Sequence, residues 1–125
     1  MNTPTDLKYT KNHEWIKVDG DVATLGITEF AQSELGDIVY VELPEIGDEF
    51  DKGDAIGTIE AVKTVADMNT PVSGEILEVN EALEDSSDSI NKDPYGNGWI
   101  AKIKISDDTE IDELLSAEEY QKLIG

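Results

Sequence analysis

Cysteine is absent from this chain of 125 residues. Without a thiol the protein can form no disulfide, has no cysteine nucleophile and cannot build a zinc–thiolate site. Any sulfur chemistry in which it takes part must therefore arrive on a cofactor. The one histidine, His13, has no second histidine near it, and the acidic segments do not follow the calcium-loop pattern. We therefore expect no metal site.

Arginine is also absent, and nine lysines face 29 acidic side chains, for a formal net charge of -20. No guanidinium is available to grip a phosphate with two hydrogen bonds. Because binding to nucleic acid depends on phosphate neutralisation by Lys and Arg, we expect no nucleic-acid partner. An acidic surface favours proteins that carry basic docking patches. Adaptation to salt, or solubility alone, is an alternative explanation for the charge, and the composition does not separate the two.

Long apolar runs are missing too, and nowhere does one approach the length that spans a membrane. Residues 1–15 contain neither the apolar core of a signal peptide nor an Arg-rich amphipathic segment. We therefore expect a cytoplasmic protein that does not bind membranes.

What the chain does contain is a series of short β-like segments separated by turn signals, which is typical of a small β sandwich or barrel. The Asp19-Gly20 dipeptide suits a tight hairpin turn. The length suits a single domain over residues 1–125. The expected strands are residues 15–18, 22–27, 38–43, 55–62, 65–69, 74–79 and 100–105.

Two helices are expected beside this mainly β body. Thr28 can cap a short helix that Gly36 ends. Near the C-terminus, apolar residues recur at helical spacing, and Ser116 with Glu119 can form a capping box, so we predict a helix over about 109–124 that covers the β core. The acidic segment 81–88 is poor in large apolar residues and predicts a solvated loop.

Lys63 lies between two of the predicted strands, with Glu60 before it and Asp67 after it. A catalytic lysine needs a lowered pKa, whereas nearby carboxylates favour the charged form, so a catalytic role is disfavoured. A lysine at a hairpin tip can instead be presented to a modifying enzyme. Amide formation would remove its charge and turn its stem into a tether.

The surroundings of Lys63 resemble the lipoyl-lysine hairpin of lipoyl carrier domains, with Glu60 and Val62 before the lysine and Gly74 in the segment Pro71-Val72-Ser73-Gly74-Glu75 after it. Three further segments resemble the H-protein family of the glycine cleavage system: His13-Glu14-Trp15, the run GITEFAQSELGDIVYVELPEIG over 26–47, and NKDPYGNGW over 91–99. Together they cover nearly the whole chain in the family's order.

Residues beside the lysine distinguish related families. Biotin carriers typically have methionine on both sides of the target lysine, whereas Val62 and Thr64 stand here. Lipoyl domains of 2-oxoacid dehydrogenases commonly have Asp before the lysine and lack the N-terminal and C-terminal extensions. Two positions depart from the family's pattern: Ala61 stands where Ser is common, and Thr64 where Ala is common.

The resemblance implies a flattened β barrel or sandwich of the lipoyl type, with its core hairpin over 55–79, and a carrier that is not an enzyme. Lipoate on Lys63, added by a lipoate ligase or a lipoyl/octanoyl transferase, would carry an aminomethyl group from glycine decarboxylase to an aminomethyltransferase. A dihydrolipoamide dehydrogenase would then reoxidise it. The family's arm-docking positions correspond here to Asn12, Glu14 and Asp67.

Two other functions are compatible with these residues. The chain could pass lipoate to other complexes rather than serve glycine, or it could be an unmodified acidic interaction module. A decarboxylase assay distinguishes the glycine cleavage carrier from a protein that passes lipoate to other complexes. The intact mass after expression with a lipoate ligase distinguishes both from an unmodified module.

Overall fold

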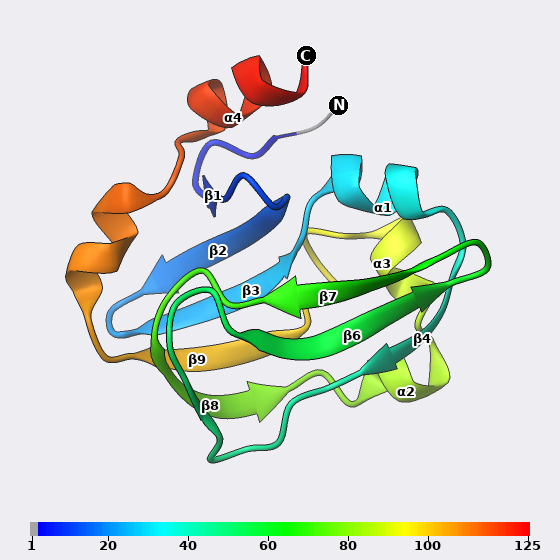
Figure 1. Cartoon of the computed structure of the whole chain (residues 1–125), viewed down its shortest axis with the longest axis horizontal. Helices are drawn as coiled ribbons and strands as arrows, with labels where there is room; N and C mark the ends of the chain where they lie inside the picture. Colours follow the sequence, from blue (N-terminus) through cyan, green and yellow to red (C-terminus); the bar gives the residue numbers. More distant parts are fainter. Residues whose placement is uncertain (1–2) are drawn as a thin grey trace.

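Two antiparallel β-sheets make up the body of the structure, a computed structural model that describes residues 3–125 (Figure 1). The six-stranded sheet has the order β1-β2-β3-β9-β8-β5, and the three-stranded sheet has the order β4-β6-β7. This mainly β architecture confirms the fold class predicted from the sequence. The strands are β1 (Lys8–Tyr9), β2 (Glu14–Asp19), β3 (Val22–Ile27), β4 (Ile38–Glu42), β5 (Glu49–Phe50), β6 (Ala55–Ala61), β7 (Val65–Asn69), β8 (Gly74–Val79) and β9 (Ala101–Ile105).

Short helices cover the ends of the sheets. They are α1 (Glu29–Leu35), α2 (Ala82–Asp85), α3 (Ser89–Lys92), the 3-10 helix η1 (Asp108–Glu113) and α4 (Ala117–Ile124). The predicted caps of α1 are present: the side chain of Thr28 accepts a hydrogen bond from the Ala31 N–H at 3.2 Å, and Gly36 ends the helix with a φ of 81°. No helix among residues 3–125 is long and apolar enough to cross a membrane.

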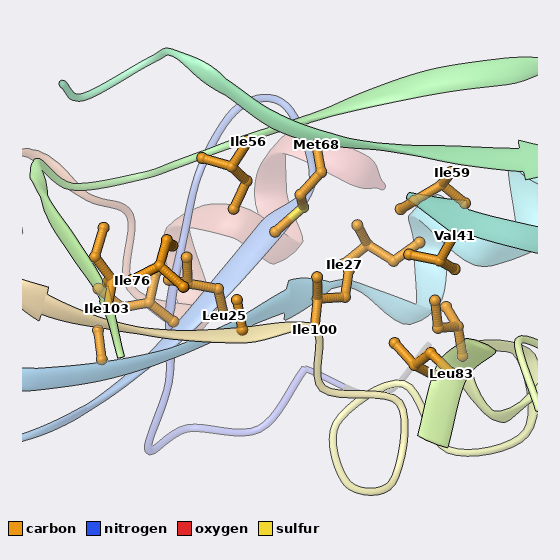
Figure 2. Close-up of a cluster of buried hydrophobic side chains, with 14 of the residues drawn as sticks. Leu25, Ile27, Val41, Ile56, Ile59, Met68, Ile76, Leu83, Ile100 and Ile103 are labelled. Carbon is orange, nitrogen blue, oxygen red and sulfur yellow. The ribbon is translucent and has the colours of Figure 1, made fainter. Parts of the chain in front are cut away.

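The alternation of side chains along the strands fills the space between the sheets. Along β9, Ala101, Ile103 and Ile105 are buried, while Lys104 is exposed, as the sequence predicts. Figure 2 shows side chains of the two sheets pointing toward one another, among them Met68 of the smaller sheet. The main core therefore lies between the sheets and holds the smaller sheet over the larger one.

A second, smaller cluster attaches the C-terminal helix to the edge of the larger sheet. Its buried members are Leu7, Tyr9, Trp15, Ala117 and Tyr120. The rings of Tyr9 and Tyr120 stack with their centroids 4.7 Å apart and an interplanar angle of 8°. A Cβ on Gly26 would lie 2.6 Å from the Trp15 ring, so glycine at this position lets the indole lie against β3.

The C-terminal helix is shorter than the predicted span of 109–124. Residues 108–113 form the 3-10 helix η1, Leu114 is extended, and only α4 is α-helical. The physical reason is a backbone pairing: Tyr9 N donates to Leu115 O at 2.9 Å, and Leu115 N donates to Tyr9 O at 2.8 Å. A residue whose N–H and C=O both pair with β1 cannot also pair within a helix. The Ser116–Glu119 capping box is present and begins α4.

The prediction of a solvated loop over 81–88 is also wrong. This segment contains α2, whose Leu83 is 1% exposed and belongs to the main core. The remaining residues of the helix are exposed, so one apolar side chain anchors an otherwise acidic turn. The sequence analysis also did not predict the short strands β1 and β5 or the helix α3.

Leu83→Ala should lower the free energy of unfolding by about 2–5 kcal/mol, because it removes a buried side chain and leaves a cavity in the core. The matched control is Leu77→Ala in β8, where the side chain is 40% exposed and less apolar area is lost. Urea unfolding of both variants measures the difference. Equal destabilisation of the two would contradict the anchoring role of Leu83.

Candidate functional site

Lys63 lies at the tip of the hairpin formed by β6 and β7, which projects at the right-hand edge of Figure 1. The strands pair as far as Glu60 and Val65, and Ala61 N donates to Thr64 O at 2.8 Å, leaving Val62 and Lys63 as the turn. Val62 N also donates to Asp37 O at 3.0 Å. The tip is therefore tied both across the hairpin and to the residue that precedes β4.

The side chains at this tip face solvent. Lys63 is exposed, and Val62 is 72% exposed. Among residues 3–125, none of the ion pairs includes Lys63. Its Cε lies 3.7 Å from the position that a Cβ would take on Gly36, so the lysine stem runs toward the end of α1. An enzyme that acylates this amine could reach it without rearranging the fold.

The residues predicted to support attachment occupy different places. Glu60 is exposed on β6, opposite Val65 and Tyr40 on the outer face of the smaller sheet. Gly74 begins β8 in the larger sheet, where a Cβ would lie 1.9 Å from Lys104 O. The structure therefore gives Gly74 a packing role in the pairing of β8 with β9, while Val62 directly precedes the lysine and Glu60 lies three residues before it in β6.

A cavity of about 320 Å³ lies beside the hairpin, and we refer to it as the arm cleft. The start of β2 and its preceding turn, the helix α1, and both strands of the hairpin line it. It brings together all three residues for which docking was predicted, Asn12, Glu14 and Asp67. Its apolar lining consists of Ile27, Phe30, Ala31, Leu35, Ile59 and Ala66.

A second hollow, of about 380 Å³, is slightly larger but lies at the other end of the hairpin. Glu49, Asp51 and Asp54 line it, with Phe50, Gly74 and Ser106. Asp54 precedes β6, whereas Lys63 follows it, so the length of the strand separates this hollow from the lysine. The arm cleft is the better candidate site because it combines apolar walls with a buried carboxyl group and is lined by both strands of the hairpin that bears Lys63.

Glu14 is the most unusual residue of the arm cleft. It is 3% exposed, and both carboxyl oxygens accept hydrogen bonds: Oε1 from Thr10 Oγ1 at 2.8 Å and Oε2 from Asn69 N at 3.0 Å. Both donors are neutral. Burial raises the pKa of Glu14 to about 7, although these two hydrogen bonds act to lower it. The cleft thus holds a carboxyl group that no cationic side chain neutralises in the described structure.

The turn before β2 holds Asn12 and Glu14 at the cleft. Thr10 Oγ1 accepts from the backbone N–H groups of Asn12 and Glu14, both at 3.2 Å. Between them His13 has a φ of 68°, the only positive φ of a non-glycine residue among residues 3–125. The centroid of the His13 ring lies 4.7 Å from that of the Phe30 ring. Burial lowers the pKa of His13. The Nδ1 of His13 lies 2.8 Å from the hydroxyl of Tyr120 in α4.

Several cleft residues were missed by the sequence analysis. Phe30 and Ala31 belong to the helix predicted between Thr28 and Gly36 but had no predicted role in a site, and Thr10 had no predicted role at all. The spacing of Thr10 and Glu14 is a recognisable signal, because a hydroxyl residue often bonds to backbone N–H groups a few residues ahead. The cavity itself depends on the distance between α1 and β7, which no local pattern encodes.

The raised pKa of Glu14 predicts how stability depends on pH. Between pH 4.5 and about pH 7 the unfolded chain releases a proton that the folded protein retains, so the free energy of unfolding falls as the pH rises through this window. Glu14→Gln cannot ionise. Its free energy of unfolding should therefore rise relative to the native protein by an amount on the order of 3 kcal/mol across the window.

Urea unfolding at several pH values measures this difference. The control is Glu84→Gln, which replaces an exposed carboxylate of α2. A difference between Glu14→Gln and the native protein that stays constant with pH would show that Glu14 ionises normally when folded.

Comparison with known proteins shows the family of the chain. The family model described as "Glycine cleavage H-protein" matches residues 7–125. A protein of Staphylococcus epidermidis named "Glycine cleavage system H protein" is 55% identical over 125 residues, which is 100% of this chain and 99% of that protein. One of the same name from Staphylococcus saprophyticus subsp. saprophyticus is 54% identical with the same coverage.

The fold is similar to that of a crystal structure of a glycine cleavage system H protein from Mycobacterium marinum. The TM-score is 0.90 at 41% sequence identity, and the match covers 98% of each chain. The two-sheet body is thus the flattened barrel or sandwich of lipoyl carriers, as predicted. On the family match, the identity over full length and the shared fold, this chain belongs to the glycine cleavage H-protein family, the carrier component of the glycine cleavage system.

Proposed function

We propose that this chain is a lipoylated carrier in which Lys63 bears lipoate and the arm cleft shelters the loaded arm. The observation that supports this most is the position of an exposed lysine at the tip of a hairpin whose own strands line the cleft. The single lipoyl-carrier domain and the cytoplasmic location expected from the sequence are parts of the same proposal.

When attached, the lipoyl dithiolane supplies the sulfur that accepts the aminomethyl group from glycine decarboxylase, yields it to the aminomethyltransferase and is reoxidised by dihydrolipoamide dehydrogenase. The chain itself catalyses none of these steps. The hard chemistry belongs to cofactors of the partner enzymes. The chain's residues present the attachment point, orient the arm and exclude water from it.

The exposed tip suits attachment by a lipoate ligase or a lipoyl/octanoyl transferase. Lys63 needs no activation by its own neighbours, because the attaching enzyme brings an activated acyl group to it. The backbone bonds of Ala61 and Val62 hold the turn in one shape, which an enzyme can recognise. Exposed Glu60 and Val62 lie close to the lysine and are available for that contact.

The arm cleft fits both ends of a loaded arm. Its apolar side chains suit a hydrocarbon chain and a sulfur-containing group. The amine of the aminomethyl cargo is cationic near neutral pH, and Glu14 offers a carboxyl group with no cationic partner. A cation beside Glu14 favours the ionised carboxylate and offsets the effect of burial. The buried site would also keep water from the cargo.

The length of the hairpin is compatible with docking of the arm at Asp67. Asp67 follows Lys63 by four residues along β7, a separation of at most about 14 Å in an extended chain. An extended lysine amide of lipoate is of similar length. Asp67 and Asn12 are both exposed, so they would contact the cargo from the mouth of the cleft, with Glu14 deeper inside.

Lys63→Arg should abolish lipoylation, because the guanidinium keeps the charge of lysine but does not form the amide. Intact-mass measurement after expression with a lipoate ligase should show one lipoyl increment on the native protein, mapped by peptide analysis to Lys63. Lys11→Arg, another exposed lysine, is the control and should be modified as the native protein is. A native protein without the increment would refute the carrier function. If the protein is lipoylated but glycine decarboxylase does not load it, the result would instead support the alternative in which the chain passes lipoate to other complexes.

Glu14→Gln and Asp67→Asn should shorten the lifetime of the aminomethyl group on the arm. We expect a loss of about 10- to 100-fold for Glu14→Gln, because a hydrogen bond to a charged group contributes about 1.5–3 kcal/mol, and a smaller loss for exposed Asp67. Release of formaldehyde or ammonia from loaded protein measures the lifetime, with Glu84→Gln as the control. Lifetimes equal to that of the native protein in both variants would exclude docking at these carboxyl groups.

A further inference from the structure

Tyr120 of the C-terminal helix lies behind the arm cleft without lining it. Its side chain is 0% exposed, and its hydroxyl lies 2.7 Å from Thr28 Oγ1 and 2.8 Å from His13 Nδ1. We propose that Tyr120 is a positioning residue of the arm cleft, whose hydroxyl holds the His13 turn against the start of α1. This inference rests on the proposed docking of the arm and adds the C-terminal helix to that site.

The two partners of the hydroxyl belong to two segments that form the cleft: His13 lines it, and Thr28 caps the helix α1, which lines it. His13 stands between Asn12 and Glu14, which are two of the polar residues that line the cleft. Thr28 caps α1, whose Phe30 and Ala31 supply apolar wall. One hydroxyl thus bridges the segment that carries the carboxyl group and the helix that faces the hydrocarbon part of the arm.

The His13 turn needs such support. A φ of 68° is uncommon for a residue with a side chain and persists where surrounding contacts hold it. One of these contacts is a backbone bond, from Thr28 N to His13 O at 3.0 Å. The Tyr120 hydroxyl supplies a second connection between the same two segments, this time through the imidazole ring. Together they fix both the backbone and the side chain of His13, and with them the direction in which Glu14 enters β2.

The Tyr120 hydroxyl can act as a fixed point because its ring is immobilised. The ring stacks on Tyr9, and the backbone of Tyr9 pairs in both directions with Leu115, just before α4. The capping box of Ser116 and Glu119 fixes the first turn of the same helix. An apolar residue at position 120 would cover the sheet equally well. The buried hydroxyl adds only its two hydrogen bonds, one with His13 of the cleft lining and one with Thr28, the cap of α1.

Tyr9 provides an unusually close control. It is the other ring of the stacked pair, is also 0% exposed, and its hydroxyl donates to Pro4 O at 2.6 Å rather than to a residue of the cleft. Tyr9→Phe and Tyr120→Phe therefore each remove one buried phenol hydroxyl from the same cluster and keep the ring. A purely structural role predicts similar effects of the two changes, whereas the positioning role predicts different ones.

The test measures two properties of both variants. In the unmodified protein, Tyr120→Phe should increase hydrogen exchange at the backbone N–H groups of His13 and Thr28. It should also shift the NMR titration of the His13 ring. Tyr9→Phe should leave both the exchange rates and the titration as in the native protein. In the lipoylated and loaded protein, Tyr120→Phe should shorten the lifetime of the aminomethyl group about 3- to 10-fold, the effect of one hydrogen bond. Tyr9→Phe should leave this lifetime unchanged.

Equal behaviour of the two variants in either measurement would overturn the positioning role. Glu14→Gln in the same lifetime assay separates this failure from that of the docking itself. A lifetime shortened by Glu14→Gln but not by Tyr120→Phe would reject Tyr120 alone. A lifetime that neither change shortens would reject the docking proposal, and the role of Tyr120 with it.

Discussion

The hydrogen bond from Asn69 N to Glu14 Oε2 is the contact around which the cleft is organised. Asn69 ends β7 in the smaller sheet, and Glu14 begins β2 in the larger one, so this bond joins the two sheets at one edge of the arm cleft. The other carboxyl oxygen is held by Thr10, which also organises the turn containing Asn12 and His13. Glu14 thereby links the hairpin that bears Lys63 to the turn that forms the opposite wall.

Glu14 is a poor choice for stability alone. A buried carboxyl group with only neutral donors loses much of its hydration when ionised, which is why its pKa is raised. An amide could make similar hydrogen bonds without that penalty. Such a residue is understandable where a cation binds from outside the chain, because the ligand then supplies the missing charge. The buried Glu14 carboxyl group, which is costly to ionise in the protein alone, is thus the group proposed to bind the cationic cargo.

The strands and the hairpin were predictable because their signals are local: alternation of apolar residues, Gly20 in a tight turn, and a lysine between two β segments. The ends of the chain were less predictable. Helical spacing near Leu114 and Leu115 was misread, because the pairing of Leu115 with Tyr9 joins residues more than 100 positions apart. Glu14 and Asp67 are two among 29 carboxyl residues, and composition cannot separate them from a solvated surface. Only the resemblance selected them, and the structure shows that they line one cavity.

The hairpin supplies only part of the cleft, and this limits what a hairpin alone could do. Ile59, Ala66 and Asp67 come from β6 and β7, whereas the remaining lining residues come from the turn before β2, from β3 and from α1. A chain that had only the hairpin could carry an arm but could not enclose its far end. The proposed shelter therefore also uses segments at both ends of the sequence: Glu14, the first residue of β2, provides the carboxyl group, and the C-terminal helix packs behind the turn before it. In the proposed function, attachment of the arm and protection of its cargo therefore depend on different parts of the chain.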